Sequence, residues 1–345
     1  MIIAVMTFFL LIGTVSVVGN IIVLFVVYKS KQLRHSQYIY KCSIAISDVI
    51  WGFSISTFFI STSLRYMNLK GVSILEKYDN TKSPDVTIDK NNFTTYRHEI
   101  QEAIFYLDDF NKDDRKWFLT FIYYVLQYVT PITLFVSFIS LVFASIDRFV
   151  ALAFPFRYKQ INSIKLAKIV SAFIWLFTAA IHTVTIILCF ESSGTPSLLF
   201  QPIDYSFSEF PTYSLHQNIT AAVLFMLFSV LWVLTCLTLC SLYKSYKRSL
   251  TLNRKALKGL SLEKQMSLVL IFMVLGFTFS LFPTIYSHIY LYLYNKEFKG
   301  NIFNPKTVFI SVAFLTTNSV WNFLIYNILN KKFRSALNNV CLKCK

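Results

Sequence analysis

Apolar residues in this chain gather in long runs that are separated by shorter polar segments. Each run is long enough to cross the hydrocarbon core of a bilayer, which requires roughly 20 helical residues. Because lipid offers the backbone no hydrogen-bond partner, every run is predicted to be an α-helix rather than part of a membrane β-barrel. The predicted spans are residues 2–28, 38–64, 117–150, 166–190, 219–243, 265–294 and 307–329. The predicted fold is therefore all-α, a bundle of seven transmembrane helices.

The charged residues between the runs predict which side of the membrane each segment faces. The basic segments are residues 29–41, 157–168, 244–258 and 331–345, with Lys41 at the end of the first. Residues 191–209 contain acidic side chains but neither lysine nor arginine. Because basic segments stay in the cytoplasm, we predict a cytoplasmic C-terminus and an extracellular N-terminus.

Composition supports a membrane protein. The chain is 55% hydrophobic and 14% charged, whereas a soluble domain is nearer a quarter charged. Its net charge of +16 lies mainly in the short inner segments, so we predict contact with the lipid bilayer and no nucleic-acid partner. The first apolar run is too long for the core of a signal peptide, which favours a membrane span.

Two segments outside the spans carry candidate modification sites. Residues 65–116 are predicted to form a long first extracellular loop, and sequons predict glycosylation at Asn92 and Asn218 on the outer side. We predict one receptor-sized domain over residues 1–329, followed over residues 330–345 by an amphipathic cytoplasmic helix and a short tail. Cys341 and Cys344 in that tail are either palmitoylated or reduced thiols.

Polar groups inside the apolar runs carry the most information, because each is costly in lipid. Asp48 lies within the second run and, if ionised and unpaired, would cost at least roughly 2.5 kcal/mol to insert. It either hydrogen-bonds neighbouring helices or serves an ion site or proton switch.

Asp147 and Arg148 end the third run, and Glu263 precedes the sixth on the same predicted side. An Arg148–Glu263 pair would link two helix ends, whereas a lone arginine would extend to the membrane interface.

The order of these residues resembles the rhodopsin-like family of G-protein-coupled receptors over nearly the whole chain. The matching positions are Gly19, Asn20, Asp48, Asp147, Arg148, Phe149, Trp175, Phe277, Pro283, Asn322, Tyr326 and Phe333. The resemblance implies that the chain transmits the binding of an extracellular ligand to a heterotrimeric G protein.

The resemblance also implies a sodium pocket and an activation switch. The pocket positions all bear oxygen, as a hard cation requires, and are Asp48, Ser137, Asn318, Ser319 and Asn322. No cofactor is required, and sodium would act as an allosteric modulator. Arg148 would be held at rest by Asp147 and Glu263. The other switch positions are Tyr243, Asn322, Tyr326, Phe277 and Pro283. Phe156, together with the freed Arg148, would contact the G protein.

The chain departs from the family pattern at several places. Leu281 stands where a tryptophan is usual, Phe323 replaces the proline of the last motif, and Thr235 occupies the place of a fifth-span proline. Tyr123 replaces the cysteine of the common outer disulfide, which predicts a free thiol at Cys189. Since prolines kink helices, the way the fifth and seventh helices move is left open.

The ligand class is narrowed only by exclusion. Thr130 stands where amine receptors carry aspartate, and Thr316 where opsins carry the retinal-binding lysine, which disfavours both classes. The predicted ligand pocket consists of Gln127, Thr130, Pro131, Phe282, Tyr286 and His288. His288 alone is more often a packed interfacial residue. Such a mixture suits a small neutral or lipid-like molecule, or a peptide end.

Two other function classes fit less well. The alternative is a secondary transporter or another multi-span protein without G-protein coupling. A transporter would show internal repeats and interrupted helices, but no repeat is evident and Asp147-Arg148 has no evident role in transport. An enzyme is not predicted, because the histidines are scattered without metal-binding spacing. G-protein activation without ligand, compared with uptake of labelled solutes, discriminates receptor from transporter.

Overall fold

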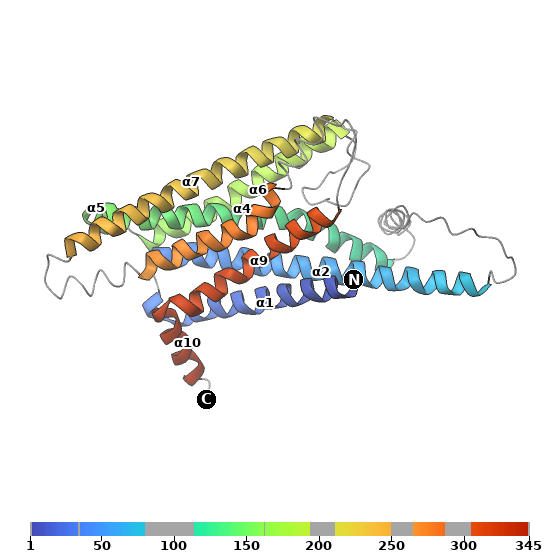
Figure 1. Cartoon of the computed structure of the whole chain (residues 1–345), viewed down its shortest axis with the longest axis horizontal. Coiled ribbons are helices and arrows are strands. Elements are labelled where there is room, and N and C mark those ends of the chain that lie inside the picture. The colour runs from blue at the N-terminus through green and yellow to red at the C-terminus, as the bar shows by residue number, and fades with distance from the viewer. Residues whose placement is uncertain are drawn as a thin grey trace.

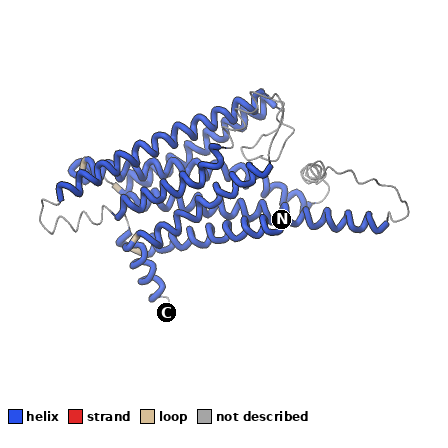
Figure 2. Tube along the Cα trace, in the orientation of Figure 1, coloured by secondary structure: helices blue, strands red, loops and turns tan. Residues whose placement is uncertain are grey.

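A computed structural model describes residues 2–33, 35–79, 114–161, 163–193, 211–249, 265–286 and 305–343. Within these ranges the chain is helical apart from short connections, and no strand occurs in them (Figure 2). The helices are α1 (Ile2–Lys29), η1 (Lys31–Leu33), α2 (Ser36–Asp79), α4 (Asp114–Ala153), α5 (Pro155–Ile161), α6 (Ile164–Ser193), α7 (Pro211–Ser249), α9 (Pro305–Leu329) and α10 (Lys331–Lys343). A further helix covers Gln265–Tyr286 and is called the 265–286 helix. The prediction of an all-helical protein is confirmed.

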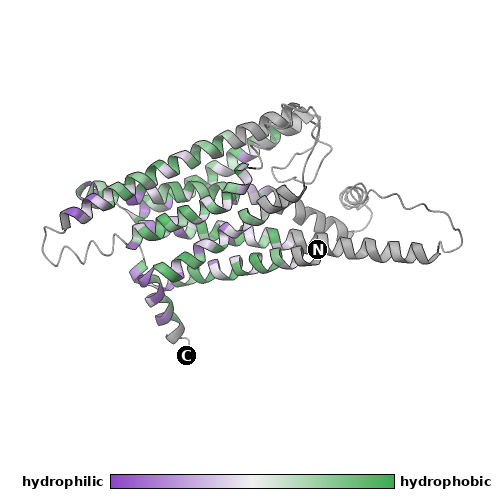
Figure 3. Cartoon of the chain, in the orientation of Figure 1, coloured by the Kyte–Doolittle hydropathy of each residue, from purple (hydrophilic) through white to green (hydrophobic). Residues whose placement is uncertain are grey.

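Several helices have the length and composition of membrane spans. In the described residues, five segments qualify: Thr7–Lys29, Tyr128–Ala153, Ile164–Val184, Phe225–Lys247 and Gln265–Tyr286. Large apolar side chains cover their outward faces, as on α6, where Phe173, Leu176 and Phe177 are exposed. Figure 3 shows hydrophobic residues along the length of the bundle and hydrophilic ones at the end that carries α5 and α10. An apolar surface of this extent is expected against lipid rather than water.

The long helices lie side by side, and α10 turns away from them after α9 (Figure 1). Helix α2 contacts α1, α4, α6 and α9, so it occupies a central position. The apolar core includes a pair of tilted rings in the bundle interior, Phe138 and Phe277, whose centroids lie 4.7 Å apart. Polar side chains on α2 therefore face several helices at once.

Helices α1 and α2 cross where both carry glycine. A Cβ atom added to Gly52 would lie 2.9 Å from the backbone oxygen of Gly13, which is closer than real Cβ contacts. At Gly19 an added Cβ would lie 2.7 Å from the ring of Phe323, the residue that replaces the family's proline. Small residues allow such close approach between membrane helices.

The start of α10 is fixed by an asparagine cap. The Phe333 backbone N–H donates to Asn330 Oδ1 at 3.1 Å, which satisfies one of the free donors at the helix N-terminus. Asn330 Nδ2 also donates to the Tyr38 hydroxyl at 3.1 Å, which ties α10 to α2. A helix thus covers most of the predicted tail segment.

Helix ends differ from the predicted span ends. Helix α2 continues through Asp79, whereas the predicted span ends at residue 64, and α7 begins at Pro211 rather than at residue 219. The physical reason is that hydropathy marks where lipid ends, while a helix continues through polar residues with adequate helix propensity. The first part of the predicted outer loop is therefore helical, and its residues 80–113 lie outside the described residues.

We expect Gly52→Ala to lower the free energy of unfolding by about 1–3 kcal/mol, because the new methyl group meets a backbone oxygen that cannot rotate away. Thermal unfolding of the purified protein in detergent measures this. Val18→Ala, on the exposed face of α1, is the matched control and should change stability by less than about 0.5 kcal/mol. Equal midpoints for the two variants would contradict the close crossing.

Candidate functional site

One half of the candidate site surrounds Asp48 on α2. The carboxylate is only 3% exposed, and Asn322 Nδ2 on α9 donates to its Oδ2 at 2.7 Å. A small cavity lies beside it. The cavity is lined by Ser47, Asp48, Trp51, Thr133, Leu134, Ser137, Leu315, Asn318 and Ser319.

The structure brings the predicted sodium-pocket residues together. Asp48, Ser137, Asn318 and Ser319 line the cavity, and Asn322 reaches it through its hydrogen bond to Asp48. All are buried, and they come from α2, α4 and α9. Within the described residues, no lysine, arginine or histidine forms an ion pair with Asp48. A carboxylate surrounded by hydroxyl and amide oxygens fits a small hard cation.

Asn20 fixes the helices behind this cavity. Its Nδ2 donates to the backbone oxygens of Ser16 and Ser319, at 2.9 Å each. Ser16 Oγ in turn donates to the backbone oxygen of Asp48 at 2.9 Å. Helices α1, α2 and α9 are thereby joined next to the carboxylate, which explains why Asn20 occurs together with Asp48.

A second set of hydrogen bonds lies further toward the polar end of the bundle. Trp175 Nε1 on α6 donates to Ser43 Oγ on α2 at 3.0 Å, and Ser140 Oγ on α4 donates to the same oxygen at 3.1 Å. One serine hydroxyl thus connects three helices. Removing the indole donor would leave polar groups in the interior with fewer partners.

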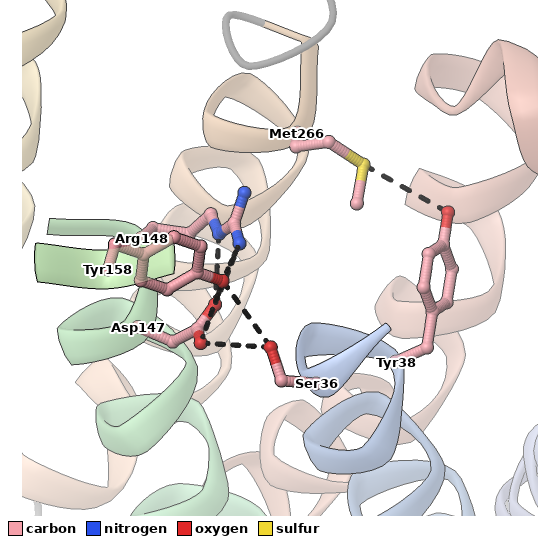
Figure 4. Close-up of polar contacts among 6 residues, drawn as sticks. All are labelled: Ser36, Tyr38, Asp147, Arg148, Tyr158 and Met266. Carbon is pink, nitrogen blue, oxygen red and sulfur yellow. Dashed lines mark hydrogen bonds and ion pairs between the residues drawn. The ribbon is translucent and has the colours of Figure 1, made fainter. Parts of the chain in front are cut away.

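The other half of the site, at the polar end of the bundle, is a cluster around Arg148. Arg148 Nη2 lies 2.8 Å from Asp147 Oδ2 and donates to the Tyr158 hydroxyl at 2.9 Å. The Tyr158 hydroxyl donates to Asp147 Oδ1 at 3.1 Å, and Ser36 Oγ donates to the same oxygen at 3.1 Å (Figure 4). We call Ser36, Asp147, Arg148 and Tyr158 the inner clasp. It joins α2, α4 and α5.

The Tyr158 phenol lies on α5, outside the membrane-spanning segments. Burial raises its pKa above the ordinary value, the charge of Arg148 opposes that rise, and Asp147 adds to it. The phenol therefore stays protonated at neutral pH. It can accept a hydrogen bond from the guanidinium while it donates one to the carboxylate, so it bridges both members of the ion pair.

Tyr158 and Ser36 are members of the candidate site that the sequence analysis missed. Tyr158 follows Phe156 by two residues in a basic segment, and nothing in its type marks it as a partner of Arg148. The predicted Arg148–Glu263 pair involves Glu263, which lies outside the described residues. Among the described residues, Arg148 is held by its ion pair with Asp147 and its hydrogen bond to Tyr158.

The other predicted switch residues occupy different surroundings. Tyr326 and Phe277 are buried, and Pro283 is half-buried, beside the buried Leu281 that replaces the usual tryptophan. Tyr243 on α7 is 68% exposed. Phe156 on α5 is 84% exposed, so a partner can reach it from the polar end of the bundle.

The predicted ligand-pocket residues do not all face the interior of the bundle. Thr130 and Pro131 are buried in α4, whereas Phe282 and Tyr286 are 65% and 57% exposed. The last two continue an outward stripe of the 265–286 helix that also contains Phe272, Leu275 and Phe279. The residues of this helix that turn toward the bundle at that level are Leu281 and, half-buried, Thr284 and Ile285.

Several predicted sites fall where the structure gives no description. Asn92, His288 and Cys344 lie outside the described residues, and the side chains of Gln127, Cys189, Asn218 and Cys341 are likewise not described. Glycosylation, lipidation and the free outer thiol stay predictions.

Comparison with known proteins identifies the family. Residues 111–326 match the family described as 7 transmembrane receptor (rhodopsin family), and a search of curated proteins found no match. The matched region covers more than half of the chain and includes Arg148, Trp175, Asn322 and Tyr326. The membrane-length helices agree with it, so this is a multi-pass membrane protein. The chain belongs to the rhodopsin family of seven-transmembrane receptors.

Proposed function

We propose that this protein is a seven-span receptor that transmits the binding of an extracellular ligand to a heterotrimeric G protein. The single observation that carries the proposal is the inner clasp, in which Arg148 is held by Asp147 and Tyr158 at the polar end of the bundle. A partly buried ion pair fixed by further hydrogen bonds adopts discrete arrangements rather than a continuous range, as a switch requires.

The proposed topology places the clasp in the cytoplasm and the N-terminus outside. Lys165 and Lys168 at the start of α6, Lys244 and Lys247 near the end of α7, and the basic residues of α10 all belong to the polar end. The positive-inside rule then assigns this end to the cytoplasm. The G protein would approach from that side.

In the proposed mechanism the closed clasp is the resting state. Opening it frees the guanidinium of Arg148 to contact the G protein, with the exposed Phe156 on α5 as a second contact. Tyr326, and Tyr243 from α7, would turn inward to support the freed arginine. The ligand is an extracellular molecule of unassigned class. A monoamine or retinal is disfavoured, because Thr130 and Thr316 replace the aspartate and the lysine that bind those ligands.

We further propose that sodium binds beside Asp48 and favours the resting state. The residues present fit the ion, since hydroxyl and amide oxygens from α4 and α9 surround an acidic group on α2. When bound, sodium would supply the positive charge that stabilises the carboxylate. Asp48 would anchor the ion, and Asn322 would keep α9 next to α2 through its hydrogen bond.

Opening the clasp should activate the receptor without ligand. We expect Asp147→Asn and Tyr158→Phe to raise basal G-protein activation several-fold in cells that express promiscuous G proteins, because each removes bonds that hold Arg148. Glu263→Ala should act in the same direction if Glu263 joins the clasp. Activity is normalised to surface expression.

Arg148→Ala should be silent, and Arg157→Ala, at an exposed basic position nearby, is the matched control that should behave like wild type. If neither clasp variant engages any G protein at normal surface levels, the assignment as a G-protein-coupled receptor is rejected.

Sodium should stabilise the purified receptor against heat. When its concentration is ten times its dissociation constant, an ion that binds only the folded state raises the free energy of unfolding by about 1.4 kcal/mol. This corresponds to a rise of a few degrees in the thermal midpoint. The comparison uses sodium chloride against choline chloride at equal ionic strength. Asp48→Asn should abolish the difference while Asp147→Asn retains it. An identical sodium response in Asp48→Asn would show that the carboxylate only hydrogen-bonds its neighbours.

A further inference from the structure

Lys41 occupies an unexpected position at the inner end of α2. The charge pattern predicts it as part of a basic cytoplasmic flank, yet its side chain turns inward and is only 1% exposed. Its Nζ has no hydrogen-bond partner. An ammonium group has three donors and is strongly hydrated, so complete burial without an acceptor is unfavourable unless another interaction offsets it.

Two tyrosine rings provide that interaction. The Lys41 ammonium lies 4.9 Å from the ring centroid of Tyr38 and 4.8 Å from that of Tyr326. Both distances are within the range of a cation–π contact, which strengthens when the cation is shielded from water. Tyr38 belongs to α2 and Tyr326 to α9, so the ammonium connects the two helices.

The two rings are fixed in different ways. The Tyr38 hydroxyl accepts a hydrogen bond from Asn330 Nδ2 at 3.1 Å. It donates one to Met266 Sδ at 4.0 Å (Figure 4). The Tyr326 hydroxyl is buried and makes no hydrogen bond, while its ring packs against Phe333 with centroids 6.0 Å apart. The position of Tyr326 therefore depends on the faces of its ring rather than on its hydroxyl group.

The inner clasp lies close enough to act on Lys41 electrostatically. Arg148 acts on the ammonium as a like charge and Asp147 as an opposite one. In the closed clasp Asp147 offsets part of the effect of Arg148 on the ammonium. Separating Asp147 from Arg148 would leave Lys41 facing a less compensated positive charge, which disfavours the buried ammonium and weakens its contact with the Tyr326 ring.

We propose that Lys41 is a positioning residue that holds the ring of Tyr326 in the resting arrangement through a cation–π contact. The contact itself stands on the distances and burial above, and its effect on signalling rests on the proposed receptor function. It assigns a role to a lysine that the sodium pocket and the clasp do not use. Neutralising Lys41 or weakening the face of the Tyr326 ring should destabilise the resting state.

The test replaces Tyr326 with phenylalanine and then with mono-, di- and trifluorinated phenylalanine by nonsense suppression. Fluorine withdraws electron density from the ring face and weakens a cation–π contact stepwise with little change of shape. Loss of the hydroxyl is common to the whole series. Two quantities are measured: the thermal midpoint of the purified receptor, and basal G-protein activation in cells.

We expect the midpoint to fall stepwise with fluorination and basal activation to rise by roughly threefold to tenfold across the series. In a Lys41→Met background both trends should vanish. Lys29→Met is the matched control, because Lys29 is exposed and lies 5.8 Å from the ring of Phe25. The series in the native Lys41 background remains informative even if Lys41→Met folds poorly.

A midpoint independent of fluorination in the native background would overturn the inference, whatever the G-protein result. A falling midpoint with unchanged basal activation, in a receptor that Asp147→Asn does activate, would overturn the positioning role and leave only a structural contact. Failure of Asp147→Asn and every other variant to activate a G protein would overturn the proposed function, including the effect of Lys41 on signalling.

Discussion

The structure depends on one constraint: a polar group buried among membrane-spanning helices is costly unless it has a partner, and several of these groups have that partner on another helix. Asp48 meets this constraint through Asn322, Ser43 through Trp175 and Ser140, and Arg148 through Asp147 and Tyr158. Apolar contacts between helices are interchangeable with contacts to lipid and allow sliding. Hydrogen bonds do not, because an unsatisfied donor or acceptor is costly in this environment. The polar contacts therefore fix the relative positions of the helices.

These contacts also explain how a fixed bundle can change shape. The hydrogen bonds connect different helices and act only over a short distance. A movement of α9 or α4 must therefore break one set of hydrogen bonds and form another. The glycines of α1 and α2 hold one side of the bundle closely packed, while α9 carries both Asn322 and Tyr326. A shift of α9 would thus alter the cavity beside Asp48 and the surroundings of Lys41 together.

Much of this arrangement is predictable from the sequence, and the limits are physical. Lipid allows only helices, and polar residues within it are rare, so the all-helical fold, Asp48 and the Asp147–Arg148 pair follow from the pattern, whereas the oxygen-bearing neighbours of Asp48 follow from the resemblance to the family.

Tyr158 and Ser36 do not follow from the pattern, because their type is ordinary and only geometry brings them to Arg148. The inward turn of Lys41 is also hidden, since the charge rule counts lysines without regard to direction. The prediction that Phe282 and Tyr286 line the pocket is wrong, because adjacent positions on a helix differ in direction by about 100°. A misjudged rotation of the helix by one residue therefore turns a predicted inward side chain outward.

The most direct test of the central claim is a distance measurement by double electron–electron resonance. Spin labels at Lys168 on α6 and Phe272 on the 265–286 helix, both exposed, report the spacing of helix ends in a receptor whose other accessible cysteines are serine. The account predicts one distance population for the receptor alone and a second, distinct population when nucleotide-free G protein is added, absent in Arg148→Ala. An unchanged distribution in a receptor with bound G protein would contradict it.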